Sequence, residues 1–218
     1  MDVLTVLRDS LYFSRRHLMN IVRLCLPLIV LESVLLQLWF WQFDGDEQSV
    51  QAVVVGAVFY PMYSTLLLLY LDARSRGKTP TLRAVFNRMC PFYPKVLGQR
   101  ALGALLVLIG FMLLVVPAIW VMVRLVFAQY LLVLRGYPIV EAMRESVRMT
   151  RGHFFRIMFC MLAVMVPIVL LELGTLVLVP DLSLVGRIAL SSLSTFLQLF
   201  SLVVLYRLFM LVEEQQPQ

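Results

Sequence analysis

Charge is scarce in this sequence. Only 15% of the 218 residues are charged, 61% are hydrophobic, and the mean hydropathy is +0.88. Soluble domains are about 25% charged and about 45–50% apolar, and a soluble core of this length could not hide so much apolar surface from water. The composition therefore excludes an ordinary soluble domain and points to a protein that a lipid bilayer solvates.

Cysteine, histidine and catalytic motifs are scarce as well. The three cysteines, Cys25, Cys90 and Cys160, have no CxxC spacing, which argues against a disulfide framework or a zinc site. The two histidines, His17 and His153, fit membrane-interface anchors better than metal ligands. The sequence also lacks HExxH, GxSxG and a phosphate-binding glycine loop. We therefore expect no enzyme activity, no cofactor and no metal ion.

Long apolar runs dominate what is present. A helix needs about 20 mainly apolar residues to span a bilayer. Six segments meet this length: Leu18–Trp41, Val50–Leu71, Val96–Val116, Pro117–Leu134, Phe154–Val179 and Ile188–Val212. The first is too long for the apolar part of a signal peptide, so we expect it to remain as an anchor. Pro117 is expected to start the fourth span after a tight turn, and a single kinked or re-entrant element is the alternative.

Lys and Arg are concentrated in alternate connections. Basic residues occur before the first span, between spans two and three, and between spans four and five, whereas the other connections carry Asp44, Asp46, Glu47 and Asp181 against a single Arg187. Because positive residues favour the cytoplasmic side, both termini are predicted to be cytoplasmic. The net charge of +6 is spread between apolar runs and forms no continuous groove, so nucleic acid is not an expected partner.

The predicted cytoplasmic segments each contain a short stretch with helical apolar spacing and interspersed basic residues. This pattern is typical of an amphipathic helix in the headgroup region. The first and third stretches also match, since Leu7-Arg8-Asp9-Ser10-Leu11 corresponds to Met143-Arg144-Glu145-Ser146-Val147, while the middle one is degenerate. The alternative is that positively charged membrane junctions all look alike.

The repeat predicts an all-α fold in one membrane domain. Its three units, 1–72, 73–135 and 136–218, would each be an amphipathic interfacial helix followed by a transmembrane hairpin.

Three ionisable residues fall inside the predicted spans, where each costs roughly 2.5–3.5 kcal/mol at a helix centre. Arg124, Glu172 and Glu32 are expected at similar depths in the outer half of spans four, five and one. Pairing Arg124 with Glu172 or with Glu32 would remove most of this cost. One interpretation is a polar site for a lipid headgroup, an ion or a proton. The other is an ion pair that fixes packing, or side chains that reach to the outer headgroups.

Two further sets of polar residues are candidates for binding. The arginines of the interfacial stretches are expected to contact lipid phosphates: Arg8, Arg15, Arg83, Arg88, Arg144, Arg148 and Arg151. Span six carries a polar stripe on one helical face: Ser191, Ser194, Thr195, Gln198 and Ser201. Close helix packing is the first interpretation of this stripe, and the lining of a wet cavity is the second. Tyr60, Tyr63 and Ser64 form a weaker patch in span two.

A set of short motifs follows in order from Pro117. They are Pro117-Ala118-Ile119-Trp120, then Arg124, then Glu141-Ala142-Met143-Arg144-Glu145-Ser146, then Met149-Thr150-Arg151-Gly152-His153-Phe154. This order resembles the YciC-like family of bacterial inner-membrane proteins, and the membrane portion of some glycerophosphodiester phosphodiesterases looks similar. Arg135-Gly136 departs from the pattern, in which an acidic residue is expected beside the glycine. The resemblance implies six helices in a bacterial cytoplasmic membrane and no catalytic residue.

The sequence therefore predicts a non-enzymatic, multi-pass protein of the bacterial inner membrane that acts in envelope or lipid homeostasis. Its expected partners are the phospholipid bilayer, anionic lipid headgroups, and a membrane or periplasmic protein. The alternative is a transporter or channel for a small solute or lipid, with the three intramembrane charges as its site. A lipid-modifying membrane enzyme is a weaker alternative.

Overall fold

The computed structural model describes residues 3–42, 48–78, 80–178 and 184–214, which form helices and turns without a strand. The helices are α1 (Val3–Gln42), α2 (Gln48–Ser75), α3 (Leu82–Met89), α4 (Tyr93–Leu113), α5 (Val115–Leu125), α6 (Ala128–Tyr130), the π-helix η1 (Leu131–Arg135), α7 (Ile139–Met149), α8 (Phe154–Leu178) and α9 (Leu184–Glu214). The predicted all-α fold is confirmed over these residues.

Six helical segments are long and apolar enough to cross a membrane. They are Met19–Leu38, Val53–Ser75, Tyr93–Leu113, Val115–Arg135, Phe154–Leu171 and Ile188–Glu214. Each overlaps one of the six predicted spans, so their number and approximate bounds are confirmed. These helices indicate a multi-pass membrane protein.

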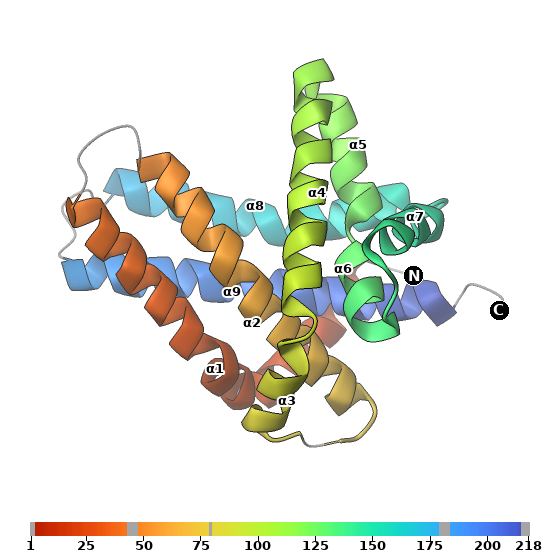
Figure 1. Ribbon diagram of the computed structural model, residues 1–218, viewed down its shortest axis with the longest axis horizontal. Coiled ribbons are helices and arrows are strands. Elements are labelled where there is room, and N and C mark those ends of the chain that lie inside the picture. The colour runs from red at the N-terminus through yellow and green to blue at the C-terminus, as the bar shows by residue number, and fades with distance from the viewer. Residues whose placement is uncertain (1–2, 43–47, 79, 179–183, 215–218) are drawn as a thin grey trace.

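The long helices form two arms (Figure 1). α1 packs against α2 and α9, and α8 packs against α9, so these four helices make the larger arm. α4 and α5 pack against each other and project away from the others as the smaller arm. The short helices α3 and α7 lie near the base of the smaller arm, where the two arms meet.

The core lies where the arms meet. In α2, every residue from Leu66 to Leu71 is buried, which is typical of a helix with neighbours on all sides. The rings of Tyr130 and Phe209 stack with their centroids 5.6 Å apart, and Phe127 meets Phe209 edge-on at 5.6 Å. Aromatic pairs contribute about 0.5–1.5 kcal/mol beyond area burial, so these rings fasten the second half of span four to α9.

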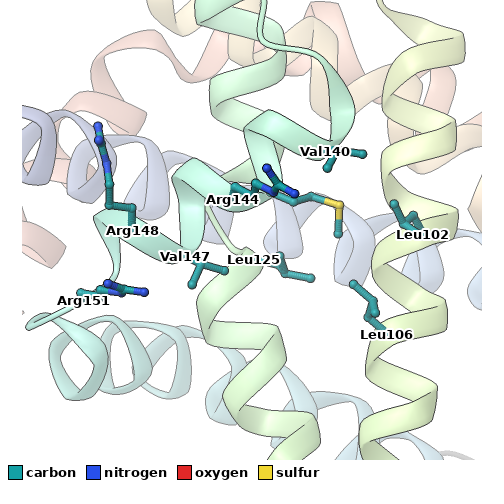
Figure 2. Close-up of a pocket in the computed structure, with 9 residues that line it drawn as sticks. Leu102, Leu106, Leu125, Val140, Arg144, Val147, Arg148 and Arg151 are labelled. Atoms are coloured by element: carbon teal, nitrogen blue, oxygen red, sulfur yellow. The ribbon is translucent and has the colours of Figure 1, made fainter.

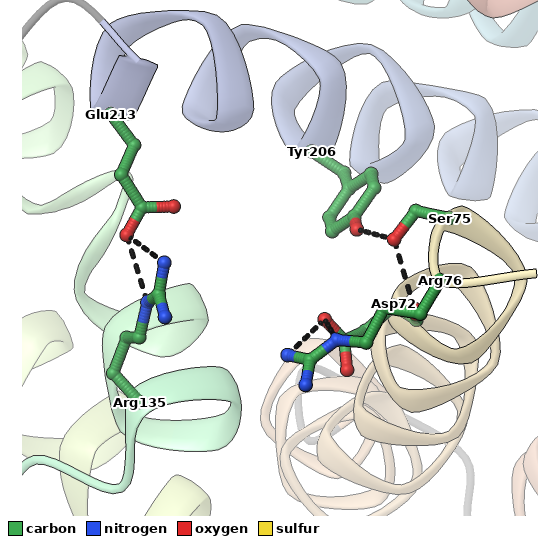
Figure 3. A network of polar contacts seen from close by, with 6 residues as sticks. All are labelled: Asp72, Ser75, Arg76, Arg135, Tyr206 and Glu213. Atoms are coloured by element: carbon green, nitrogen blue, oxygen red, sulfur yellow. Dashed lines mark hydrogen bonds and ion pairs between the residues drawn. The ribbon is translucent and has the colours of Figure 1, made fainter.

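Polar contacts join the ends of three spans (Figure 3). The hydroxyls of Ser75 in α2 and Tyr206 in α9 lie 2.9 Å apart. At the end of η1, Arg135 Nε donates to Glu213 Oε1 of α9 over 2.8 Å. Arg135 departs from the family pattern described above, yet the structure gives it an acidic partner from another helix. The ends of α2, span four and α9 therefore lie at the same end of the molecule.

The predicted interfacial helices are found in two of three places. α3 and α7 are separate short helices, as expected. The stretch before span one is different, because it continues into the span as the single 40-residue helix α1. Figure 1 shows that α1 changes direction along its length. The separate first helix predicted from the sequence is thus wrong as a separate element, since nothing between Leu11 and Leu18 ends the helix.

The turn between α4 and α5 is a single residue. Leu114 is extended, with φ −175° and ψ 162°, and α5 begins at Val115. Pro117 therefore lies in the first turn of α5, where its missing N–H leaves no bond unmade. The tight turn is confirmed, and it lies slightly before the predicted one. Side chains around it are strongly exposed, with Met112 at 80%.

Span four is not the uninterrupted helix that was predicted. α5 ends at Leu125, two turn residues follow, and the chain continues through α6 and η1. Short π-helical segments of this kind occur frequently at functional sites. No Gly or Pro lies between Leu125 and Arg135, so the cause of the interruption lies elsewhere in the chain.

Candidate functional site

α7 begins and ends at residues that stop helices on either side. Gly136 adopts φ 74° directly after η1, a left-handed conformation that glycine reaches without strain. Pro138 follows in the extended conformation, with φ −59° and ψ 156°, just before the first turn of α7. At the other end Gly152 has φ 81°. These turns set α7 across the base of the smaller arm.

α7 separates apolar from charged side chains. Its buried residues follow the spacing of one helical face: Ala142, Met143, Ser146 and Met149. Arg144 and Arg148 are exposed, and so is Arg151 in the turn that follows. This is the amphipathic pattern expected from the sequence.

A pocket of about 560 Å³ lies between α7, α4 and α5 (Figure 2). Its apolar side is formed by Leu102 and Leu106 of α4 and Leu125 of α5. Its charged side is formed by Arg144, Arg148 and Arg151. The structure thus brings together three of the seven arginines that were predicted to contact lipid phosphates, and it places them beside an apolar surface.

The arginines of the pocket differ in their partners. Arg148 donates to Glu145 Oε1 from Nε over 3.1 Å and from Nη2 over 2.7 Å. Among the ion pairs between described residues, none involves Arg144 or Arg151. In Figure 2, Arg144 lies between the leucines of α4 and the other two arginines. Among the described residues, the pocket therefore offers two guanidinium groups without a carboxylate partner.

Ser146 joins α7 to the interruption in span four. Its hydroxyl donates to the carbonyl of Arg124 over 2.7 Å and accepts from the backbone N–H of Phe127 over 3.1 Å. A side chain inserted between helical backbone groups is a common cause of a break. Ser146 therefore supplies a hydrogen-bond partner to these two backbone groups at the point where the helix is interrupted.

Arg124 lies against α7 and the start of α8. Its Nη1 lies 3.4 Å from the carbonyl of Val147 and 3.3 Å from Thr150 Oγ1. Its guanidinium also lies 5.2 Å from the centroid of the Trp120 ring and 5.9 Å from that of Phe154, within the range of cation–π attraction. Its two described hydrogen bonds therefore go to the segment between spans four and five, which the depth argument from the sequence did not anticipate.

The other two members of the predicted charged cluster are Glu32 and Glu172. Glu32 is in α1 with 7% exposure, and its Oε1 lies 3.7 Å from the position that a Cβ on Gly56 would occupy. Its Oε2 has no hydrogen-bond partner among the described residues. The described ion pairs do not join Glu32 to Arg124. The side chain of Glu172 lies outside the described residues, so its pairing with Arg124 stays a prediction.

A buried polar network connects spans two, three and four. Gln129 Nε2 donates to Ser64 Oγ over 2.8 Å, and Gln129 Oε1 accepts from Arg100 Nη2 over 2.6 Å. The Arg100 guanidinium lies 4.3 Å from the centroid of the Tyr60 ring. The sequence singled out Tyr60 and Ser64, but it missed Gln129, whose one signal is an amide in an otherwise apolar run.

The polar stripe of α9 divides into two parts. Ser191 lies 3.3 Å from the hydroxyl of Ser33 in α1, and Ser192, which the prediction missed, donates to Ser33 over 3.1 Å. Ser201 donates within its own helix to the carbonyl of Gln198 over 2.6 Å. Ser194 is buried and Thr195 is half-buried. The contacts with α1 agree with the packing interpretation of the stripe.

The remaining predicted headgroup contacts lie apart from the pocket. Arg83 and Arg88 are exposed on α3, and Arg8 is exposed on α1. The side chains of Arg15 and His17 lie outside the described residues. Across the described part of the chain, no three His, Cys, Asp or Glu side chains are grouped so that they could hold a metal ion.

Comparison with solved structures gave no significant match to the chain. The resemblance to YciC-like proteins and to phosphodiesterase membrane regions therefore stays a prediction from the motifs quoted above. The model of one uncharacterised protein family, UPF0259, matches residues 46–211. Because this match covers most of the 218-residue chain, the protein belongs to the UPF0259 family.

Proposed function

We propose that this protein is a non-enzymatic membrane protein that binds the headgroups of anionic lipids in the pocket between α4, α5 and α7. The observation that carries the proposal is the placement of Arg144, Arg148 and Arg151 along one side of a pocket whose other side is leucine. An anionic lipid has the matching halves, because its phosphate is charged and its acyl chains are apolar.

The two halves of the pocket contribute in different ways. Guanidinium groups donate paired hydrogen bonds to phosphate oxygens, and a basic residue near an anionic membrane surface contributes about 1 kcal/mol. Leu102, Leu106 and Leu125 give the acyl chain an apolar surface against which it packs by van der Waals contact. The arginines select the charge of the lipid, while the leucines hold it beside α4.

The wider role is proposed on the same basis. We infer that the protein acts in envelope or lipid homeostasis in the bacterial inner membrane, with or without a protein partner. Both termini are proposed to be cytoplasmic, and the chain is proposed to consist of three hairpin units, of which the second and third each follow an interfacial helix. The separate short helices α3 and α7 and the common end of α2, span four and α9 support this arrangement.

The test is the combined substitution Arg144→Gln, Arg148→Gln and Arg151→Gln. Affinity for phosphatidylglycerol in otherwise zwitterionic nanodiscs should fall about thirtyfold, since Arg148 is already paired and two free arginines contribute about 2 kcal/mol together. The matched control is Arg83→Gln, Arg88→Gln and Lys95→Gln, which removes the same charge outside the pocket. Equal losses in the two triple variants would reduce the effect to net charge, and unchanged binding in the first would refute the site.

A second candidate function is the transport of protons or small cations. It is favoured by Glu32, a carboxyl that is 7% exposed and has one oxygen without a hydrogen-bond partner among the described residues. In proteoliposomes containing a pH-sensitive dye, Glu32→Gln should then abolish flux down an imposed gradient and leave the thermal transition in place. Absence of flux in the unmodified protein would count against this candidate.

A further inference from the structure

The arginines of the pocket are spread along α7 and its C-terminal turn. Arg144 lies within α7, whereas Arg151 lies in the turn that follows the helix, seven residues further along the chain. Val147 and Leu125, which also line the pocket, are apolar. In Figure 2, Arg144 lies on the side of the α4 leucines, whereas Arg151 lies toward the far end of α7. The two cations thus face different parts of the pocket.

Arg148 does not bridge these two cations, because its charge already has a partner. Both of its hydrogen bonds go to Glu145 Oε1 on the same helix. The free positive charge of the pocket therefore consists of two separated groups, at Arg144 and Arg151. A single phosphate that pairs with one of them leaves the other facing lipid or water.

Resting on the proposed lipid site, we infer that the pocket prefers a lipid with two phosphodiester groups joined by a short linker, as in cardiolipin, over a lipid with one. One phosphate pairs with Arg144 and the second with Arg151, while the linker crosses Val147. The acyl chains lie along Leu102 and Leu106 of α4. Basic pockets between transmembrane helices are a recognised setting for such headgroups.

The experiment compares two lipids at equal phosphate content. The purified full-length protein is placed in phosphatidylcholine nanodiscs with either cardiolipin or twice the mole fraction of phosphatidylglycerol. Lipids that stay bound after detergent extraction are then counted by native mass spectrometry. Cardiolipin should be retained about fivefold more strongly, the equivalent of one additional basic contact at a membrane surface.

Single substitutions test the two-point contact. Arg144→Gln and Arg151→Gln should each remove the preference for cardiolipin, while some binding of either anionic lipid persists. Arg148→Gln, which removes an arginine already paired with Glu145, should retain most of the preference. Lys95→Gln in α4 is the control outside the pocket. All four side chains are exposed, and the thermal transition of each variant is measured to confirm folding.

The outcomes separate this inference from the proposed function. Equal retention of the two lipids, or equal loss of preference in Lys95→Gln and Arg144→Gln, would overturn the two-phosphate inference and leave anionic-lipid binding standing. Retention of neither lipid above phosphatidylcholine would overturn both.

Discussion

At the scale of single residues, Ser146 makes contacts out of proportion to its size. Its hydroxyl donates to the carbonyl of Arg124, just before the interruption in span four, and accepts from the N–H of Phe127 within the interruption. Buried backbone groups without a partner are costly, so this serine allows a broken helix to exist inside an apolar protein. In the two matching stretches described above, Ser146 corresponds to Ser10, and Ser10 is buried too.

Replacing Ser146 should therefore weaken the fold. Ser146→Ala leaves the Arg124 carbonyl and the Phe127 N–H without this partner, and the free energy of unfolding should fall by about 1–3 kcal/mol. Thermal unfolding in detergent measures the change. Ser194→Ala, at another buried serine, is the control for the loss of a buried hydroxyl in itself. A loss no larger than that of the control would mean that water or a shifted backbone replaces the hydroxyl.

At the scale of helices, the smaller arm depends on close approach at its tip. A Cβ added to Gly110 of α4 would lie 2.8 Å from the Cα of Ala118 and 3.0 Å from its nitrogen. Both neighbours are backbone atoms next to the one-residue turn, so neither can move without opening the pair. Glycine is required here for space rather than for conformational freedom.

Gly110→Ala should separate α4 from α5 and lower stability by about 1–3 kcal/mol, the usual cost of overpacking. Gly103→Ala is the matched control in the same helix, because its added Cβ would meet only Gln99 Nε2 at 3.9 Å. The control should be neutral or stabilising by up to about 1 kcal/mol, as expected when alanine replaces glycine in a helix. Equal melting temperatures for the two variants would show that the arm opens without cost.

Helices were predicted well where a single stretch of sequence determines them. Twenty apolar residues suffice to form a span, and each of the six predicted spans overlaps an observed one. The interruption in span four could not be found in this way, because its cause, Ser146, is 19 residues from Phe127. The pocket was hidden for the same reason. Its arginines were identified as lipid contacts, but their leucine neighbours come from α4 and α5 and carry no signal that distinguishes them from other lipid-facing leucines.

At the scale of the whole molecule, charge distribution and helix packing are consistent with the same orientation in the membrane. The segments rich in Lys and Arg adjoin the ends of α2, η1 and α9 that meet through Ser75–Tyr206 and Arg135–Glu213. If the positive segments are cytoplasmic, as the sequence predicts, these linked ends are cytoplasmic as well.

Cysteine labelling tests this orientation. Cys90, between α3 and α4, is exposed, whereas Cys25 and Cys160 are buried. A membrane-impermeant maleimide should therefore label Cys90 in inverted membrane vesicles and spare it in right-side-out vesicles. Glu47→Cys in a Cys90→Ser background should give the opposite pattern, since residue 47 belongs to an acidic connection. Labelling of Cys90 in right-side-out vesicles would show that the predicted orientation is wrong.

The smaller arm divides into a packed base and an exposed tip. Its contacts with α2 and α7 lie at the base, whereas the side chains around the tip are exposed, Met112 and Val116 among them. Toward the tip α4 and α5 therefore rely on each other, through the close approach of Gly110 to Ala118.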